Sequence, residues 1–176
     1  MKPVRRLISE AEIEASVIQL GRRISDEYRG KPLTVIGILT GSIMLVTDLM
    51  RRIDVPHKLG LVAASSYRGD ATVAGALKVD LSELPDLAGR HVLVIDDIFD
   101  TGRTMSSIVE RVKEFAPLSV KSVVLLWKKS RMEVAIGPDY FAFEIPDEFV
   151  VGYGLDLDDE YRHLPYIGVV ESPVDL

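Results

Sequence analysis

The chain has 176 residues, of which 47% are hydrophobic and 27% are charged. This length and composition suit a folded domain with a sizeable core and exclude a disordered or collagen-like chain. The absence of cysteine excludes a disulfide framework, a thiolate metal site and a cysteine nucleophile. It also suits a reducing compartment, so we expect a cytoplasmic protein.

Acidic residues outnumber basic ones, 27 against 21, which gives a net charge of −6. Surfaces that bind nucleic acid usually carry the opposite sign, so no nucleic-acid partner is expected. No apolar run approaches the roughly 18 residues of a membrane span. The N-terminal residues show no signal peptide, and we expect no membrane partner.

Patterns typical of helices and of strands alternate along the chain. Helical spacing of apolar residues predicts helices over residues 9–28, 43–53 and 105–115. Ser9 and Glu12 form a capping box for the first helix, and Ser42 is the expected N-cap of the second. Continuous apolar runs predict buried strands over residues 33–39, 59–64, 91–95 and 120–127. Shorter apolar runs follow at residues 140–145, 149–153 and 166–170.

Fully apolar strands that alternate with helices indicate an α/β fold, with a parallel sheet covered on both faces. Ligands of such sheets lie beyond the carboxyl ends of the strands. Thr40, Asp96 and Lys128 each follow a predicted strand, so they fall at that edge. The polar, Gly-spaced residues 65–87 are typical of a long functional or mobile loop.

The sequence VLVIDDIFDTGRTM, residues 92–105, carries the most information. An apolar strand delivers Asp96 and Asp97 to the sheet edge, and a short turn then opens into a helix. The turn has free backbone N–H groups, hydroxyls, a cation and a glycine, which are the parts of a phosphate cradle. It is not a Walker A loop. Because carboxylates repel phosphate, the acidic pair suits ribose hydroxyls or a divalent cation, and the whole stretch describes a ribose-5-phosphate site.

A plainer interpretation is that the acidic pair only ends a strand and that Asp100 caps the helix. Three aspartates within five residues, directly after an apolar run, are costly for capping alone. We therefore favour the ribose-phosphate interpretation.

The same stretch resembles the PRPP-binding signature of type I phosphoribosyltransferases. Four other stretches resemble parts of the hypoxanthine-guanine branch of that family. Residues 35–42 resemble its pyrophosphate loop, and residues 65–67 resemble the start of its flexible catalytic loop. Residues 125–128 resemble its purine-reading strand end, and residues 138–167 resemble its C-terminal hood. The resemblance implies a type I phosphoribosyltransferase fold in a single domain, with a twisted, mostly parallel sheet flanked by helices and a small hood. The core would span about residues 30–137 and would contain the flexible loop at about residues 65–87. The hood would consist of the N-terminal segment and about residues 138–176.

The resemblance implies roles at the ribose-phosphate side of the site. Asp96 and Asp97 would hold the ribose hydroxyls directly or through Mg²⁺, and Asp156 would help to place a second Mg²⁺. Asp100 would be the general acid/base beside N7 of the purine. The residues expected to cradle the 5-phosphate are Thr101, Gly102, Arg103 and Thr104.

The base and the pyrophosphate would be held by other residues. Lys128 would donate to the exocyclic O6 of the purine, Phe149 would stack on the ring, and the Val150 backbone would read its edge. The pyrophosphate would face Thr40, Gly41 and Arg162, and the flexible loop would close over the site from Ser66 and Tyr67.

Two positions depart from the usual pattern of this branch. Thr40 stands where the pyrophosphate loop usually has a lysine, which removes a cation near the pyrophosphate or a subunit interface. The acidic pair is Asp-Asp where Glu-Asp is usual, so its reach to the ribose is shorter. The strained peptide of the family, often cis, would fall between Leu39 and Thr40.

The resemblance implies an enzyme that transfers the phosphoribosyl group of Mg²⁺-PRPP to hypoxanthine and guanine, working as a homodimer or homotetramer. Lys128 opposes adenine, whose exocyclic group is a donor, while a preference for xanthine stays open. A different class is a regulatory protein that binds PRPP or nucleotides on the same fold. Asp100 favours the enzyme, since such regulators tend to lack an acid there.

Overall fold

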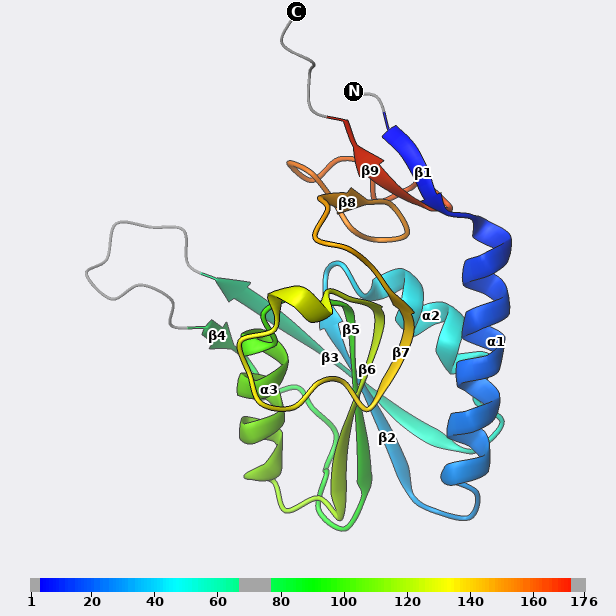
Figure 1. Ribbon diagram of the computed structural model, residues 1–176. Helices are drawn as coiled ribbons and strands as arrows, with labels where there is room; N and C mark the ends of the chain where they lie inside the picture. Colours follow the sequence, from blue (N-terminus) through cyan, green and yellow to red (C-terminus); the bar gives the residue numbers. More distant parts are fainter. Residues whose placement is uncertain (1–3, 67–76, 172–176) are drawn as a thin grey trace, which may run out of the picture.

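The computed structural model describes residues 4–66 and 77–171 (Figure 1). The helices are α1 (Glu10–Glu27), α2 (Ile43–Met50), α3 (Arg103–Lys113) and the short 3-10 helix η1 (Lys129–Arg131). The strands are β1 (Val4–Ile8), β2 (Leu33–Leu39), β3 (His57–Ser66), β4 (Leu77–Val79), β5 (His91–Phe99), β6 (Ser119–Trp127), β7 (Tyr140–Glu144), β8 (Val150–Val151) and β9 (Ile167–Val170). Within the described residues, no helix is long and apolar enough to cross a membrane.

The main sheet has the strand order β4-β3-β2-β5-β6-β7, and every neighbouring pair except β3 and β4 is parallel. Side chains of α1 and α2 pack on one face of this sheet and those of α3 on the other, in two separate apolar clusters. Alternate residues of a strand serve opposite faces, as Val35 and Ile36 of β2 do. The predicted parallel sheet with helices on both faces is therefore confirmed.

A second, antiparallel sheet of order β1-β9-β8 lies above the carboxyl edge of the main sheet (Figure 1). We call β1, β8, β9 and residues 152–166 the hood. The sequence did not predict β1, because Arg5 and Arg6 interrupt its apolar pattern. The strand forms because β9 offers it a partner, with Val4 opposite Val170 and Ile8 opposite Ile167. The hood thus joins the two ends of the chain over the edge where the predicted site residues lie.

The helix after β2 differs from its prediction. It ends at Met50 instead of residue 53, and Ser42 is not its side-chain cap. The backbone of Ser42 is already helical, with φ −74° and ψ −6°. Its hydroxyl donates to the carbonyl of Ile38, which ties the loop back to the strand that it leaves.

Strand β5 is longer than predicted and runs on through the acidic pair to Phe99. It continues because β6 runs beside it for the same length, with Asp96 opposite Val124 and Ile98 opposite Leu126. The acidic pair therefore lies inside the last part of a strand and not in the turn beyond it.

The described parts of the stretch 65–87, namely residues 65–66 and 77–87, are more regular than their polar composition suggests. Strand β3 extends to Ser66, and β4 pairs with it in antiparallel orientation. Leu81 and Leu87 are buried against the cluster that contains α3. These two contacts anchor the chain before β5 begins.

The capping box of α1 is confirmed and predicts a pH dependence of stability. Glu12 Oε2 accepts hydrogen bonds from the Ser9 N–H at 2.8 Å and the Ser9 hydroxyl at 2.6 Å. These bonds lower the pKa of Glu12. A carboxyl group with a lowered folded-state pKa stabilises the fold above its unfolded pKa, and this contribution is lost as the pH falls through the folded pKa.

We therefore expect Glu12→Gln to lower the free energy of unfolding at about pH 7 and to change it much less at a pH below the folded-state pKa of Glu12, where the wild-type carboxyl is protonated. Urea denaturation at both pH values measures this difference. Glu10→Gln, in the same turn of α1, controls for the general effect of charge near a helix N-terminus. An equal effect of Glu12→Gln at the two pH values would contradict the assignment.

Candidate active site

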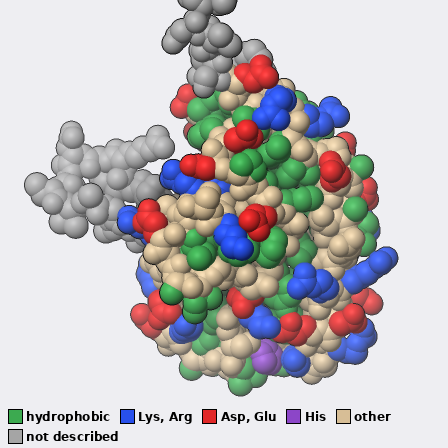
Figure 2. Space-filling model, viewed as in Figure 1, with side chains coloured by type: hydrophobic (Ala, Val, Ile, Leu, Met, Phe, Trp, Pro, Cys, Tyr) green, Lys and Arg blue, Asp and Glu red, His purple; other side chains and the backbone are tan. Residues whose placement is uncertain are grey.

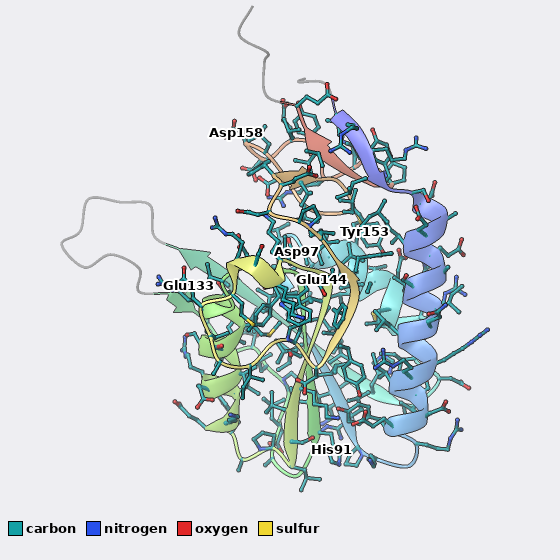
Figure 3. The ribbon with its side chains drawn as sticks, in the orientation of Figure 1. His91, Asp97, Glu133, Glu144, Tyr153 and Asp158 are labelled. Carbon is teal, nitrogen blue, oxygen red and sulfur yellow. The ribbon has the colours of Figure 1, made fainter. Side chains whose placement is uncertain are left out.

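Three segments meet at the carboxyl edge of the main sheet, beneath the hood. They are residues 40–42 after β2, residues 100–102 after β5, and Lys128 after β6. The Lys128 N–H donates to the carbonyl of Phe99 at 2.9 Å, which holds the ends of β5 and β6 together. Asp97 lies at this edge, and His91, at the start of β5, lies at the opposite end of the sheet (Figure 3).

A cavity of about 210 Å³ opens where β5 turns into α3. Its lining residues are Asp96, Asp97, Ile98, Phe99, Asp100, Thr101, Gly102, Thr104 and Met105. Gly102 precedes α3 with φ 83°, a conformation that favours glycine and turns the chain sharply into the helix. The first N–H groups of α3 have no partner within the helix, and the helix dipole favours an anion there. The cavity therefore combines carboxylates with the start of α3, where the sequence predicts a phosphate cradle.

Arg103 differs from its expected place in the cradle. It does not line the cavity, and its side chain is 74% exposed and forms an ion pair with Glu133. Glu133 is held nearby because its backbone N–H donates to the carbonyl of Thr101 at 3.0 Å. The cradle is thus built from backbone and hydroxyl groups, with the guanidinium turned away.

Asp96 and Asp97 are consecutive strand residues, so their side chains leave β5 in opposite directions. Each accepts a hydrogen bond from the next backbone N–H, that of Asp97 at 2.9 Å and that of Ile98 at 2.7 Å. Burial raises the pKa of Asp96 well above its ordinary value, and the charge of Asp97 adds to this shift. Burial also raises the pKa of Asp97, and its hydrogen bonds and the nearby Arg162 offset part of that shift. Hydroxyl donors or a cation at this pair would favour the charged form.

The loop after β2 lies directly against the acidic pair. The Leu39–Thr40 peptide bond is cis, as the resemblance implies, and Thr40 is exposed. A Cβ atom on Gly41 would lie only 1.7 Å from Asp97 Oδ2, so any larger residue here would displace the Asp97 carboxylate. Gly154 of the hood approaches from the other side, where a Cβ atom would lie 2.1 Å from the Gly41 carbonyl oxygen.

The hood brings Arg162 and Asp156 together. Arg162 Nη1 lies 2.9 Å from Asp156 Oδ1 and donates to the Gly154 carbonyl at 2.8 Å. Its Nη2 contacts Asp159 at 2.9 Å. The residues expected to face pyrophosphate and a second Mg²⁺ are therefore paired with each other in this structure. Arg162 also lines a larger cavity, of about 420 Å³, between α1, α2 and the hood.

The residues expected to read the purine come from two segments, the end of β6 and the start of β8. Lys128 is only 8% exposed, and its Nζ lies 3.5 Å from Asp147 Oδ1. Phe149 is 55% exposed, while Val150 is buried in β8. Of the two flexible-loop residues, Ser66 ends β3, and Tyr67 lies outside the described residues.

Two charged residues at this site, Arg131 and Asp147, were not predicted from the sequence. Arg131 Nε donates to Asp100 Oδ1 at 3.0 Å, and Arg131 Nη1 lies 3.5 Å from Asp147 Oδ2. A signal was present in the K-x-x-R spacing of Lys128 and Arg131, because residues three apart lie on one side of a 3-10 turn. Charged side chains of both signs are interspersed on the face seen in Figure 2, in keeping with these pairs.

The resemblance implies a magnesium ion, and the available ligand atoms decide how it would fit. Within residues 4–66 and 77–171, no group of three or more metal-ligating side chains could hold a metal ion by itself. Mg²⁺ is usually bound by one or two carboxylates, with waters and substrate phosphates as the other ligands. Asp96 and Asp97 can supply those carboxylates. The site therefore fits an ion that arrives with a phosphorylated substrate.

The close contact of Gly41 with Asp97 predicts a coupling between the two positions. Gly41→Ala should destabilise the protein by about 1–3 kcal/mol, because the new Cβ displaces the Asp97 carboxylate. In an Asp97→Ala background the cost should be much smaller, since the nearest remaining side-chain atom, the Cβ of residue 97, lies 3.5 Å away. Urea denaturation of the four proteins of this cycle measures the coupling. Equal costs in both backgrounds would show that the two residues do not touch.

Comparison with known proteins identifies the family. Residues 6–158 match the model of the phosphoribosyl transferase domain. The chain is 42% identical to hypoxanthine phosphoribosyltransferase of Salmonella typhimurium over 171 residues, which cover 95% of each protein. It is 40% identical to hypoxanthine-guanine phosphoribosyltransferase of Streptococcus pneumoniae over 168 residues, covering 96% of this chain and 93% of that protein.

A solved structure shows the same relationship. The crystal structure of a hypoxanthine phosphoribosyltransferase from Staphylococcus aureus superposes with a TM-score of 0.88 and 38% sequence identity, covering 95% of this chain and 91% of that one. The chain therefore belongs to the phosphoribosyltransferase family and, within it, to the group of hypoxanthine phosphoribosyltransferases.

Proposed function

We propose that this enzyme transfers the 5-phosphoribosyl group of Mg²⁺-PRPP to a 6-oxopurine, hypoxanthine or guanine, in purine salvage. The observation that carries the proposal is the cavity at the end of β5, which has a carboxyl pair and the start of α3 on its walls. The buried Lys128 stands at the end of the neighbouring strand. The names of the relatives in Salmonella typhimurium and Streptococcus pneumoniae support the same reaction.

The ribose 5-phosphate would lie along the cavity. Its phosphate would accept hydrogen bonds from the backbone N–H groups and hydroxyls of residues 101–104, at the positive end of the α3 dipole. The ribose hydroxyls would donate to Asp96 and Asp97, whose carboxylates gain hydrogen-bond donors that favour their charged form. The site thus holds both ends of the sugar at fixed positions before the base reacts.

The reaction breaks the bond between the anomeric carbon and pyrophosphate and forms a bond from that carbon to N9 of the purine. Positive charge develops on the ribose ring, and the nearby carboxylates of Asp96 and Asp97 would stabilise it. Magnesium supplies charge neutralisation of the pyrophosphate leaving group when it is bound. Gly41, whose backbone lies against Asp97, would bring the loop after β2 next to the leaving group.

Asp100 would accept the purine proton. Its carboxylate lines the cavity, directly after the last residue of β5, and its Oδ1 is held by Arg131. As N9 attacks, the proton on N7 would move to the carboxylate, and the reverse reaction would return it.

Lys128 would select the base. An ammonium group donates hydrogen bonds only, so it favours an exocyclic oxygen and opposes the amino group of adenine. Phe149 is exposed although it is a large aromatic residue, which suits a surface that a planar base covers.

The direct test is turnover of PRPP with hypoxanthine, guanine, xanthine, adenine and uracil, each with magnesium and with EDTA. We expect magnesium-dependent nucleotide formation from hypoxanthine and guanine only. Turnover of xanthine alone would revise the base specificity. PRPP binding without turnover of any base would instead support a regulatory protein.

Two substitutions test the roles within the site. Asp100→Asn should lower kcat by about 100-fold or more, with a much smaller change in KM, because a proton acceptor acts in the transition state. Lys128→Gln should lower the preference for hypoxanthine over adenine by about tenfold, the value of one charged hydrogen bond. Steady-state kinetics with both bases measures these effects. Unchanged kcat in the first variant, or unchanged selectivity in the second, would remove that residue from its role.

A further inference from the structure

Four charged side chains of alternating sign connect the proposed proton acceptor to the proposed base-reading lysine. Asp100 Oδ1 lies 3.0 Å from Arg131 Nε, and Arg131 Nη1 lies 3.5 Å from Asp147 Oδ2. The other oxygen of Asp147, Oδ1, lies 3.5 Å from Lys128 Nζ. We call Asp100, Arg131, Asp147 and Lys128 the charge row. Its two ends are the residues that would touch the purine, and its two middle members have no role assigned so far.

We propose that Arg131 and Asp147 are positioning residues, which orient Asp100 and Lys128 so that both contact one purine ring at the same time. The inference rests on the proposed transfer to a 6-oxopurine and extends it to residues that do not touch the substrate.

The contact with Arg131 determines which oxygen of Asp100 can act. Arg131 occupies Oδ1, and no hydrogen bond to Oδ2 is found within the described residues. One carboxylate oxygen is thereby fixed to the protein, and the other remains for the purine N7. The hydrogen bond and the charge of Asp100 raise the pKa of Arg131, and Asp147 adds to this shift, so the guanidinium stays charged.

Asp147 has the corresponding effect on Lys128. A buried ammonium needs a counter-charge, and Asp147 is the carboxylate found within 4 Å of Lys128 Nζ in the described part of the chain. An ammonium has three N–H donors, so the contact with Asp147 leaves donors for the exocyclic oxygen of the base. The contact therefore fixes the direction of the lysine side chain and leaves N–H donors available for the base.

The backbone holds the row at a defined distance from the phosphate cradle. The Arg131 N–H donates to the Lys128 carbonyl at 3.0 Å, which closes the turn of η1. Two residues later, the Glu133 N–H donates to the Thr101 carbonyl at 3.0 Å. One short segment thus connects the lysine, Arg131 and the turn that would bind the 5-phosphate.

A purely structural role fits the row less well. The side chains of Arg131, Asp100 and Asp147 are 47%, 38% and 49% exposed. Ion pairs with this exposure contribute little to stability, because water screens them. A planar base that covers them would remove that water and strengthen their interactions. The row is thus placed to act in the substrate complex more than in folding.

The test compares Arg131→Gln with Lys129→Gln by steady-state kinetics on hypoxanthine and PRPP, with melting temperatures measured in parallel. Lys129 is the matched control, because it is a cation of the same turn whose contact is the ring of Trp127. We expect Arg131→Gln to lower kcat by about tenfold, with KM for PRPP within about twofold of wild type and an unchanged melting temperature. Lys129→Gln should change none of these values.

Asp147→Asn tests the other half of the row. We expect KM for hypoxanthine to rise by about tenfold while KM for PRPP stays constant, since only the base contacts Lys128. Two results would overturn the inference while leaving the transfer reaction intact: Arg131→Gln and Lys129→Gln giving the same kcat, or Asp147→Asn leaving KM for hypoxanthine unchanged. Parallel losses of kcat, PRPP affinity and melting temperature would also overturn it, since they indicate misfolding. A wild-type protein that turns over no base would overturn the proposed function, and the positioning roles with it.

Discussion

Asp96 and Asp97 end up half-buried because β5 is still paired with β6 at their positions. Burial raises the pKa of both carboxyl groups, and the charge of Asp97 adds to the shift at Asp96. Much of the surrounding structure accommodates them. Gly41 leaves room for the Asp97 carboxylate, and Gly154 allows the hood to approach the Gly41 backbone from above. Under the proposed function, the hydroxyls and the cation that the substrate brings would favour the charged form of this pair.

The cations of the site are likewise occupied in this structure. Arg103 pairs with Glu133, Arg162 pairs with Asp156 and Asp159, and Lys128 lies against Asp147. Figure 3 shows Glu133 beside α3, with Asp97 further in beneath the hood. A substrate as negatively charged as PRPP would therefore enter a site whose cations already have carboxylate partners. A magnesium ion that accompanies the substrate would lower this cost.

Most of the sheet could be predicted from the sequence, because continuous apolar runs are typical of buried parallel strands. The predicted edge position of Thr40, the acidic pair and Lys128 follows from the same pattern, since parallel strands end on one side. What the sequence could not predict depends on tertiary partners. Strand β1 needs β9 beside it, and the end of β5 is set by the length of β6.

The contacts of individual side chains were harder still to predict. Arg103 has the sequence position of a phosphate ligand, yet Glu133 draws it away from the cavity. Arg131 and Asp147 are 16 positions apart in the chain, and η1 and the segment between β7 and β8 bring them together. Local sequence patterns do not predict such pairings, because the paired residues meet only when two distant segments fold against each other.

The most direct test of the site is a crystal structure of the protein with inosine monophosphate and magnesium. We expect the phosphate within about 3 Å of the backbone N–H groups of residues 101–104. The ribose should lie beside Asp96 and Asp97, and the purine O6 should face Lys128 Nζ. A nucleotide bound instead in the 420 Å³ cavity between α1, α2 and the hood would contradict this assignment of the site.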